Sequence, residues 1–221
     1  GVKIDNGRIY NLLRGEKGST VRLGIRRGYE PNLRYFNIIR DVIPMKSVEV
    51  AYMLDAQTGY VKVNRFSART YQEFMEAVRP MYEEQGMKNL VLDLRGNPGG
   101  YLNEASDLLS QFFPADKLLV YTEGRVEGRR EYKSSGRARF NIQNIAVLID
   151  EGSASASEIV AGALQDHDRA WIIGRRSFGK GLVQEQYPLG DGGALRLTVA
   201  RYFTPSGRCI QREYNNGEDY D

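Results

Sequence analysis

The turn at residues 152–158, which reads GSASASE, has the clearest capacity for chemistry in this sequence. An apolar run at residues 145–149 precedes it and a helical pattern follows, so the sequence predicts a strand, a tight turn and a helix. Ser155 lies at this junction, where open α/β sheets place functional side chains. The N–H of Ala156, at the start of the helix, would stabilise an oxyanion formed beside Ser155.

The same turn also has a purely structural interpretation. Ser155 and Glu158 match a capping box, in which serine caps the helix and glutamate reaches back to the cap backbone. Taken alone, the segment favours the cap over a nucleophile. The Gly-x-Ser-x-Gly pattern of α/β hydrolases is absent, so that family gains no support.

A lysine loop at residues 174–181, GRRSFGKG, follows an apolar strand pattern at 170–173. A lysine between glycines can approach another turn closely, and an apolar enclosure would favour its uncharged form, so Lys180 could take a proton from Ser155. The alternatives are a solvated loop lysine and a phosphate-binding loop. Gly181 stands where a phosphate loop needs Ser or Thr, and a strand pattern follows instead of a helix, which argues against a bound nucleotide.

A third turn, DLRGNPGG at residues 93–100, lies between a buried strand pattern and a helix pattern. The paired glycines Gly99 and Gly100 let backbone N–H groups turn inward, as the second half of an oxyanion hole requires. An ordinary strand-to-helix turn explains the same residues equally well.

The amino-acid composition restricts the reactions and partners that this chain can have. The 221 residues include 31 basic and 28 acidic side chains, and a net charge of +3 is too small to indicate a nucleic-acid partner. His167 is the single histidine, which excludes a two-histidine zinc site within the chain and leaves a serine hydrolase in need of another base. Cys209 is the single cysteine, so no internal disulfide is possible. The basic stretch at 125–139 is interrupted by glutamates, which favours a solvated hairpin or loop.

The periodicity of apolar residues predicts an α/β fold with helices packed against a mixed sheet. The run at 89–94 is typical of a strand buried on both faces. Helices are expected at 8–13, 70–85, 102–112 and 153–164, and strands at 20–26, 35–40, 59–63, 89–94, 145–149, 170–173, 182–187 and 194–203.

Together and in this order, the three turns closely resemble those of the carboxyl-terminal processing proteases, bacterial and chloroplast serine peptidases with a Ser–Lys dyad. The resemblance implies that Ser155 is the nucleophile, Lys180 the general base and Gln184 a residue that orients the lysine. It implies oxyanion donors at Ala156 and at one of the glycines at 99 and 100, with the choice between the two left open. Asp166 matches an acidic position of the family with a structural role.

The resemblance also implies an organisation. Residues 46–221 would form the family's spiral-sheet α/β protease core, and residues 1–45 the C-terminal half of a β-rich PDZ module, with the first half of that module missing. The chain is then an excised piece, and its signal segment lies outside it.

The activity so implied is a serine endopeptidase that cleaves proteins near their C-termini through an acyl-enzyme, with no cofactor and no metal. Its partners would be proteins or peptides with exposed apolar C-termini, with no nucleic acid or nucleotide, and with a homo-oligomer or an activating adaptor as further possibilities. Its location would be the periplasm or cell envelope. The alternative is a catalytically inactive peptide-binding scaffold of the same fold.

Overall fold

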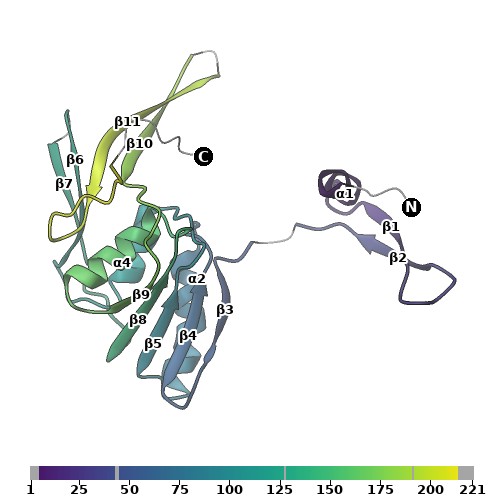
Figure 1. Cartoon of the computed structure of the whole chain (residues 1–221), viewed down its shortest axis with the longest axis horizontal. Helices are drawn as coiled ribbons and strands as arrows, with labels where there is room; N and C mark the ends of the chain where they lie inside the picture. Colours follow the sequence, from purple (N-terminus) through teal and green to yellow (C-terminus); the bar gives the residue numbers. More distant parts are fainter. Residues whose placement is uncertain (1–4, 43–44, 127, 191, 214–221) are drawn as a thin grey trace. The chain divides into compact units, whose positions relative to one another are not determined.

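The computed structural model describes residues 5–42, 45–126, 128–190 and 192–213 (Figure 1). These residues form two compact units, one within residues 1–45 and the other within residues 46–221. Within the described part of the chain, no helix is long and apolar enough to cross a membrane.

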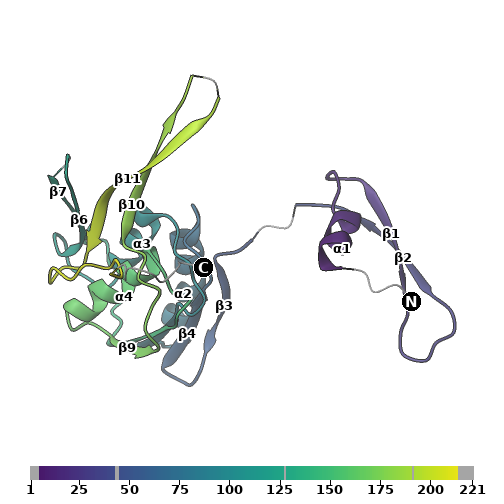
Figure 2. The ribbon, with the colours of Figure 1, turned by 45° about the horizontal axis from the view of Figure 1, so that its top comes forward.

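The first unit consists of one helix and one hairpin, which Figure 2 shows side by side. Helix α1 (Asn6–Leu13) precedes strands β1 (Thr20–Ile25) and β2 (Arg34–Ile39), which pair in antiparallel register. All three elements were expected from the sequence. No described side chain of this unit is buried, and Ile39 remains 70% exposed. The unit therefore has no hydrophobic core of its own.

The second unit contains a five-stranded sheet in the order β3-β4-β5-β8-β9. Strands β4, β5, β8 and β9 run parallel, and β3 pairs antiparallel at one edge, so the predicted mixed sheet is confirmed. The five strands span, in sheet order, Val48–Met53, Thr58–Val63, Asn89–Asp93, Asn144–Ile149 and Trp171–Gly174.

Three helices connect the parallel strands, and the predicted helices are confirmed in position. They are α2 (Thr70–Glu83), α3 (Leu102–Leu109) and α4 (Ala156–Asp166). The parallel strands follow one another in chain order across the sheet, and right-handed connections then place every helix on the same face. That face holds the core, whose fully buried side chains include Phe74, Leu92, Leu108, Ile145 and Leu164.

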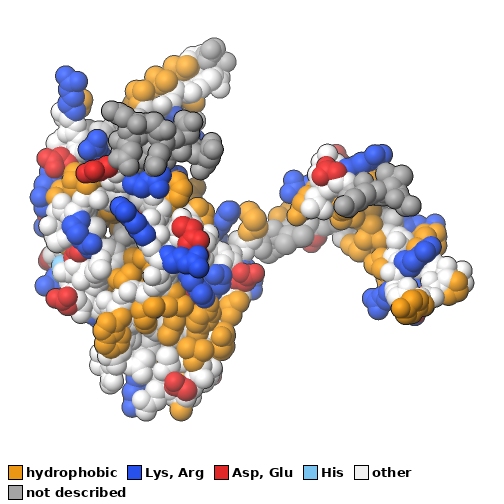
Figure 3. All heavy atoms as spheres, in the orientation of Figure 1, with side chains coloured by type: hydrophobic (Ala, Val, Ile, Leu, Met, Phe, Trp, Pro, Cys, Tyr) orange, Lys and Arg blue, Asp and Glu red, His pale blue; other side chains and the backbone are white. Residues whose placement is uncertain are grey.

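Among the described residues, no helix covers the opposite face of the sheet (Figure 1). Its side chains alternate with the core positions, so on β5 Leu90 and Leu92 are buried while Asn89 and Val91 are only half-buried. The prediction that 89–94 is buried on both faces is therefore wrong, because helices cover one side only. Figure 3 shows hydrophobic side chains gathered on this open face.

A second, four-stranded antiparallel sheet has the order β10-β11-β6-β7. Its β10–β11 hairpin extends away from the rest of the unit (Figure 2) and matches the hairpin expected at 182–203. The basic stretch at 125–139 includes β7, which forms a hairpin with β6, and Glu131 pairs with Arg129 and Lys133. The hairpin agrees with the charge pattern. The sequence prediction lacks β6 and β3. The strands span Leu182–Pro188, Ala194–Phe203, Leu118–Gly124 and Gly128–Lys133.

Candidate active site

Ser155 lies at the turn between β8 and α4, as predicted, and its backbone is strained. Its φ of 54° and ψ of −114° place a non-glycine residue outside the ordinary regions, a conformation that persists only where the surroundings enforce it. Ala156 begins α4, so its N–H is one of the first in the helix and has no acceptor inside it. The side chain of Ser155 is half-buried.

The glycine turn packs directly against Ser155. A Cβ atom on Gly99 would lie 2.6 Å from the carbonyl oxygen of Ala154 and 2.8 Å from both the nitrogen of Ala156 and the Cβ of Ser155. Gly99 also has a φ of 95°, which favours glycine. Only a residue without a side chain allows this close approach, so the structure brings the first and third predicted segments together.

The two glycines differ in what their N–H groups do. The N–H of Gly99 donates to the side-chain oxygen of Asn97 at 2.9 Å. The N–H groups of Gly100 and Ala156 donate no hydrogen bond to any of the described residues. Gly100 is exposed whereas Gly99 is buried. Gly100 is therefore the glycine whose N–H remains available to a ligand.

Asn97 and Asp150 tie these two turns together. The carbonyl oxygen of Asn97 accepts from the N–H of Ala154 at 2.9 Å and from the hydroxyl of Ser157 at 3.0 Å. One Asp150 carboxylate oxygen accepts from Gly96 N–H at 2.8 Å and Gly152 N–H at 2.9 Å. Partial burial alone would raise the pKa of Asp150, but these hydrogen bonds outweigh it and lower that pKa.

Glu158 joins the Ser155 turn to the Lys180 loop. Its carboxylate accepts from the N–H groups of Ser155 at 2.8 Å, Gly179 at 2.7 Å and Lys180 at 2.8 Å. The side chain is buried. The expected reach of Glu158 back to Ser155 is confirmed, and the same carboxylate also holds the loop 21 and 22 residues further along the chain.

The side chains of the lysine loop are less enclosed than its backbone. Lys180 and Gln184 are both exposed, and Gln184 directly follows a register shift in β10. Among the described residues, no hydrogen bond joins Lys180 to Ser155 or to Gln184. The described residues do not form the apolar enclosure that was expected around the Lys180 side chain.

A buried carboxylate stabilises the start of the glycine turn. Asp93, at the end of β5, is fully buried and accepts from Arg95 at 2.6 Å and from the hydroxyl of Tyr60 at 2.5 Å. Burial by itself would raise the pKa of Asp93, but the hydrogen bonds from Arg95 and Tyr60 outweigh it and lower the pKa to about 2. This cluster fixes the point at which the turn leaves the sheet.

The remaining polar candidates lie away from Ser155. His167 follows the C-terminal end of α4, a helix of 11 residues, which places it about 16 Å from the Ser155 end. Its ring nitrogen is 2.7 Å from the carbonyl oxygen of Leu118. Asp166 binds Arg208 and the N–H of Ser206, a structural position. Burial would raise the pKa of Asp166, but hydrogen bonds including these lower it. No cluster suited to a metal occurs among the described residues.

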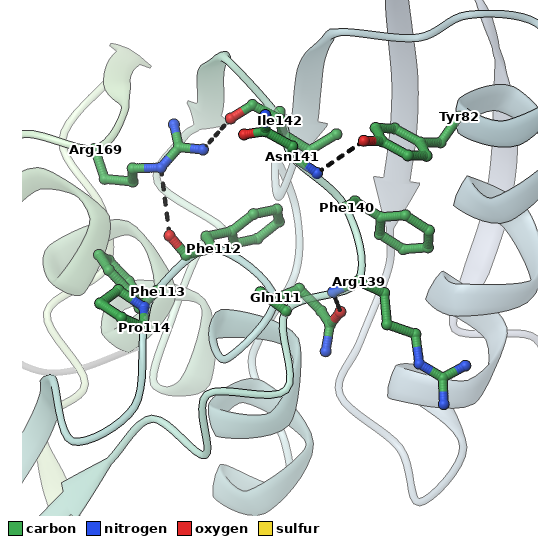
Figure 4. Close-up of a pocket in the computed structure, with 11 residues that line it drawn as sticks. Tyr82, Gln111, Phe112, Phe113, Pro114, Arg139, Phe140, Asn141, Ile142 and Arg169 are labelled. Atoms are coloured by element: carbon green, nitrogen blue, oxygen red, sulfur yellow. Dashed lines mark hydrogen bonds between the residues drawn. The ribbon is translucent and has the colours of Figure 1, made fainter.

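A separate pocket lies near the opposite end of β8 (Figure 4). Its lining includes Tyr82, Phe112, Phe140 and Arg169, and none of the predicted site residues. Arg169 donates to the backbone carbonyls of Phe112 and Ile142, so its guanidinium holds the pocket's own loops together (Figure 4). Burial lowers the pKa of Arg169.

The polar groups that assemble the site were not predicted from the sequence. Asn97 and Asp150 act through backbone and carboxylate oxygens on turns distant in sequence, and Glu158 has a second role beyond the cap. The sequence feature that could have indicated these roles is the polar residue inside each turn motif, because a simple turn does not require one. Local spacing could not show that these polar groups bind one another's turns.

Comparison with known proteins places the chain in a family. The model of Peptidase family S41 matches residues 57–218, and the chain therefore belongs to that family. A carboxy-terminal-processing protease of Bartonella bacilliformis is 40% identical over 210 residues, covering 90% of this chain and 46% of that protein. The carboxy-terminal processing protease CtpB of Bacillus subtilis is 36% identical over 203 residues, covering 91% of this chain and 42% of that protein.

A solved structure agrees with these relatives. The photosystem II D1 C-terminal processing protease is 32% identical, with a TM-score of 0.68 over 92% of this chain and 55% of that chain. The predicted α/β protease fold and the resemblance to carboxyl-terminal processing proteases are confirmed. The chain spans less than half the length of the two curated relatives named above.

Proposed function

We propose that this chain carries the catalytic centre of a serine endopeptidase in which Ser155 is the nucleophile and Lys180 the general base. The observation that carries the proposal is the Glu158 carboxylate, which binds the backbone N–H groups of both residues. Residues 25 positions apart in sequence are thereby held at one point. A buried carboxylate that organises two loops at a strained serine is typical of a preorganised site.

The chemistry follows from these positions. The Ser155 hydroxyl attacks the peptide carbonyl carbon while uncharged Lys180 accepts its proton, with Gln184 orienting the amine. The tetrahedral intermediate collapses to an acyl-enzyme, and the leaving amine takes the proton from Lys180. Water, deprotonated by Lys180, then attacks the acyl carbon. The bond to the Ser155 oxygen breaks, protonated Lys180 returns the proton to that oxygen, and the second product leaves. Each step balances without a metal or cofactor.

The oxyanion of the tetrahedral intermediate needs two donors. We assign them to the N–H groups of Ala156 and Gly100, because both are free of acceptors among the described residues. Gly99 has the complementary role: it allows the close approach of the turns, and its own N–H is bound to Asn97.

The substrate class is proposed from the relatives, which are named as carboxy-terminal processing proteases. We propose that the protein cleaves protein substrates near exposed apolar C-termini, outside the cytoplasm, and that residues 1–45 belong to a PDZ-like recognition module. The absence of buried side chains from the described residues of this range fits a module completed by other elements. A homo-oligomer or an activating adaptor protein is a further partner that we propose.

Peptidase assays on three variants test the dyad. Ser155→Ala and Lys180→Ala should each reduce kcat/KM by about a thousandfold or more, because members of a catalytic unit fail together. His167→Ala serves as the matched control and should retain activity in its folded fraction. Loss of activity in the histidine variant with retention in the lysine variant would refute the assignment.

The alternative function is an inactive peptide-binding scaffold. It is distinguished by the same assays, because a scaffold would bind peptides equally well with Ser155 or Ala at that position and would release no product. Matched peptides with a free or an amidated apolar C-terminus test the substrate class in a protein that includes the whole recognition module: the proposal expects faster cleavage of the free acid.

A further inference from the structure

The segment Ile210–Arg212 lies against the Lys180 loop. The N–H of Arg212 donates to the carbonyl oxygen of Gly179 at 2.9 Å. The N–H of Gly181 donates to the side-chain oxygen of Gln211 at 3.0 Å. Groups on both sides of Lys180 are thus bound by one segment about 30 residues further along the chain.

The glycines that flank Lys180 are explained by this contact. A Cβ on Gly181 would lie 2.2 Å from the backbone nitrogen of Gln211, and a Cβ on Gly179 would lie 2.6 Å from the Cβ of Arg212. Both distances are far below ordinary contact, so the Gly-Lys-Gly pattern lets the segment pack against the loop. The sequence had suggested only that these glycines permit some close approach.

Hydrogen bonds fix both peptide planes that meet at the Cα of Lys180. In the first plane, Arg212 binds the carbonyl of Gly179 and Glu158 binds the N–H of Lys180. In the second plane, Gln211 binds the N–H of Gly181. Because these two planes set the direction of the Cα–Cβ bond, they determine where the exposed lysine side chain starts.

We infer that Gln211 is a positioning residue for the general base, an inference that rests on the proposed function. Its side-chain oxygen is the acceptor for the N–H of the second peptide plane. Its amide nitrogen donates to the carbonyl oxygen of Arg212 at 3.1 Å, which turns the amide oxygen toward Gly181. Gln211 acts through the backbone and does not touch the reacting atoms.

A pair of substitutions of nearly equal length isolates this hydrogen bond. Gln211→Met keeps the length of the side chain but has no oxygen to accept the hydrogen bond from the N–H of Gly181. Gln211→Glu replaces the amide oxygen with a carboxylate oxygen that can accept it. The methionine variant should lower kcat about ten- to a hundredfold with little change in KM, the range expected when a reacting group is displaced by about 1 Å. The glutamate variant should restore most of that loss.

Two further measurements separate positioning from simple stability. The pH–rate profile of Gln211→Met should shift relative to wild type, because a displaced lysine has altered surroundings. Gln186→Met, on the exposed β10 strand, is the matched control and should leave kcat and the pH profile unchanged. An unshifted profile with full kcat per folded molecule in Gln211→Met would overturn the inference.

Lys180→Ala distinguishes failure of the inference from failure of the proposed function. If Lys180→Ala is inactive while Gln211→Met keeps wild-type kcat, the dyad stands and the positioning role is wrong. If Lys180→Ala remains active, the proposed function fails and the positioning role fails with it.

Discussion

The Ser155 turn is embedded in the protein, whereas the Lys180 loop exposes its functional side chain. Around Ser155, the hydrogen bonds of Asn97, Asp150 and Glu158 fix the backbone and enforce its strained conformation. Around Lys180, the backbone is bound but the side chain is exposed. The nucleophile is therefore preorganised by buried polar groups, and the base depends on the few bonds that hold its loop.

Glu158 is the one residue that serves both regions, so its loss should have the largest effect. Glu158→Ala would leave three N–H groups without their charged acceptor and should lower the free energy of unfolding by about 3 kcal/mol. Activity should fall with it, even in the folded fraction. Urea unfolding and peptidase assays measure the two effects.

Two controls sharpen this prediction. Glu158→Gln keeps one carbonyl oxygen, which can serve Ser155 and Lys180 together, so it should lose less stability than the alanine variant. Glu151→Ala removes an exposed glutamate of the same turn and should change stability by less than about 1 kcal/mol. Equal losses for Glu151 and Glu158 would mean that the buried carboxylate is not a special link.

Gly99→Ala should disturb the Ser155 turn without affecting the Lys180 loop. The new Cβ would meet backbone atoms at 2.6–2.8 Å at a φ of 95°, and we expect a loss of about 2–3 kcal/mol together with loss of activity. Gly86→Ala is the control, since its φ is 76° but no atom lies within 4 Å of the added Cβ. It should cost only about 1 kcal/mol and leave activity unchanged. Similar activity in both variants would contradict the close packing proposed at Ser155.

Acid should weaken the support of the glycine turn. The folded pKa of Asp93 is about 2, below its ordinary value of 3.8, so its ionised form stabilises the fold above about pH 4. That contribution, up to about 2 kcal/mol, is lost as the pH falls from about 4 to about 2. Asp93→Asn should therefore lower stability at pH 7 and flatten the pH dependence between pH 4 and 2. The free energy of unfolding would be measured against pH for the wild-type and Asp93→Asn proteins. Equal slopes between pH 4 and 2 would mean that Asp93 contributes nothing.

The smallest expected change is the stability of Lys180→Met. The lysine side chain is exposed, and among the described residues it forms no hydrogen bond or ion pair, so its removal should alter the free energy of unfolding by less than about 0.5 kcal/mol. Activity should nevertheless be lost. A loss of stability above about 1 kcal/mol would show that Lys180 has a structural partner.

The sequence was sufficient for the helices, most of the strands and the three turns, and insufficient for β3, β6 and the hydrogen bonds that link the turns. Apolar segments located β8 and α4 because side chains that pack in the core leave a local signal in the sequence, and the order of the turns indicated the family. The roles of Asn97 and Asp150 depend on hydrogen bonds to backbone N–H groups more than 50 residues away. The one-sided burial of β5 also escaped prediction, because an apolar run does not reveal how many faces are covered.

The exposure of Lys180 is the clearest departure from the sequence-based expectation. Glycine flanks indicated a close approach, and the structure does provide one, but to the backbone of Ile210–Arg212. The groups that enclose a side chain are set by packing between segments distant in sequence. The residue types near Lys180 therefore do not predict its exposure.

Covalent labelling tests the central claim, the Ser155–Lys180 dyad, most directly. A fluorophosphonate probe would be reacted with the wild-type, Lys180→Ala and His167→Ala proteins, and the modified residue mapped by mass spectrometry. We expect the label on Ser155, a rate at least about a hundredfold lower in the lysine variant, and an unchanged rate in the histidine variant. Labelling of another serine, or equal labelling of Ser155 with and without Lys180, would contradict the account.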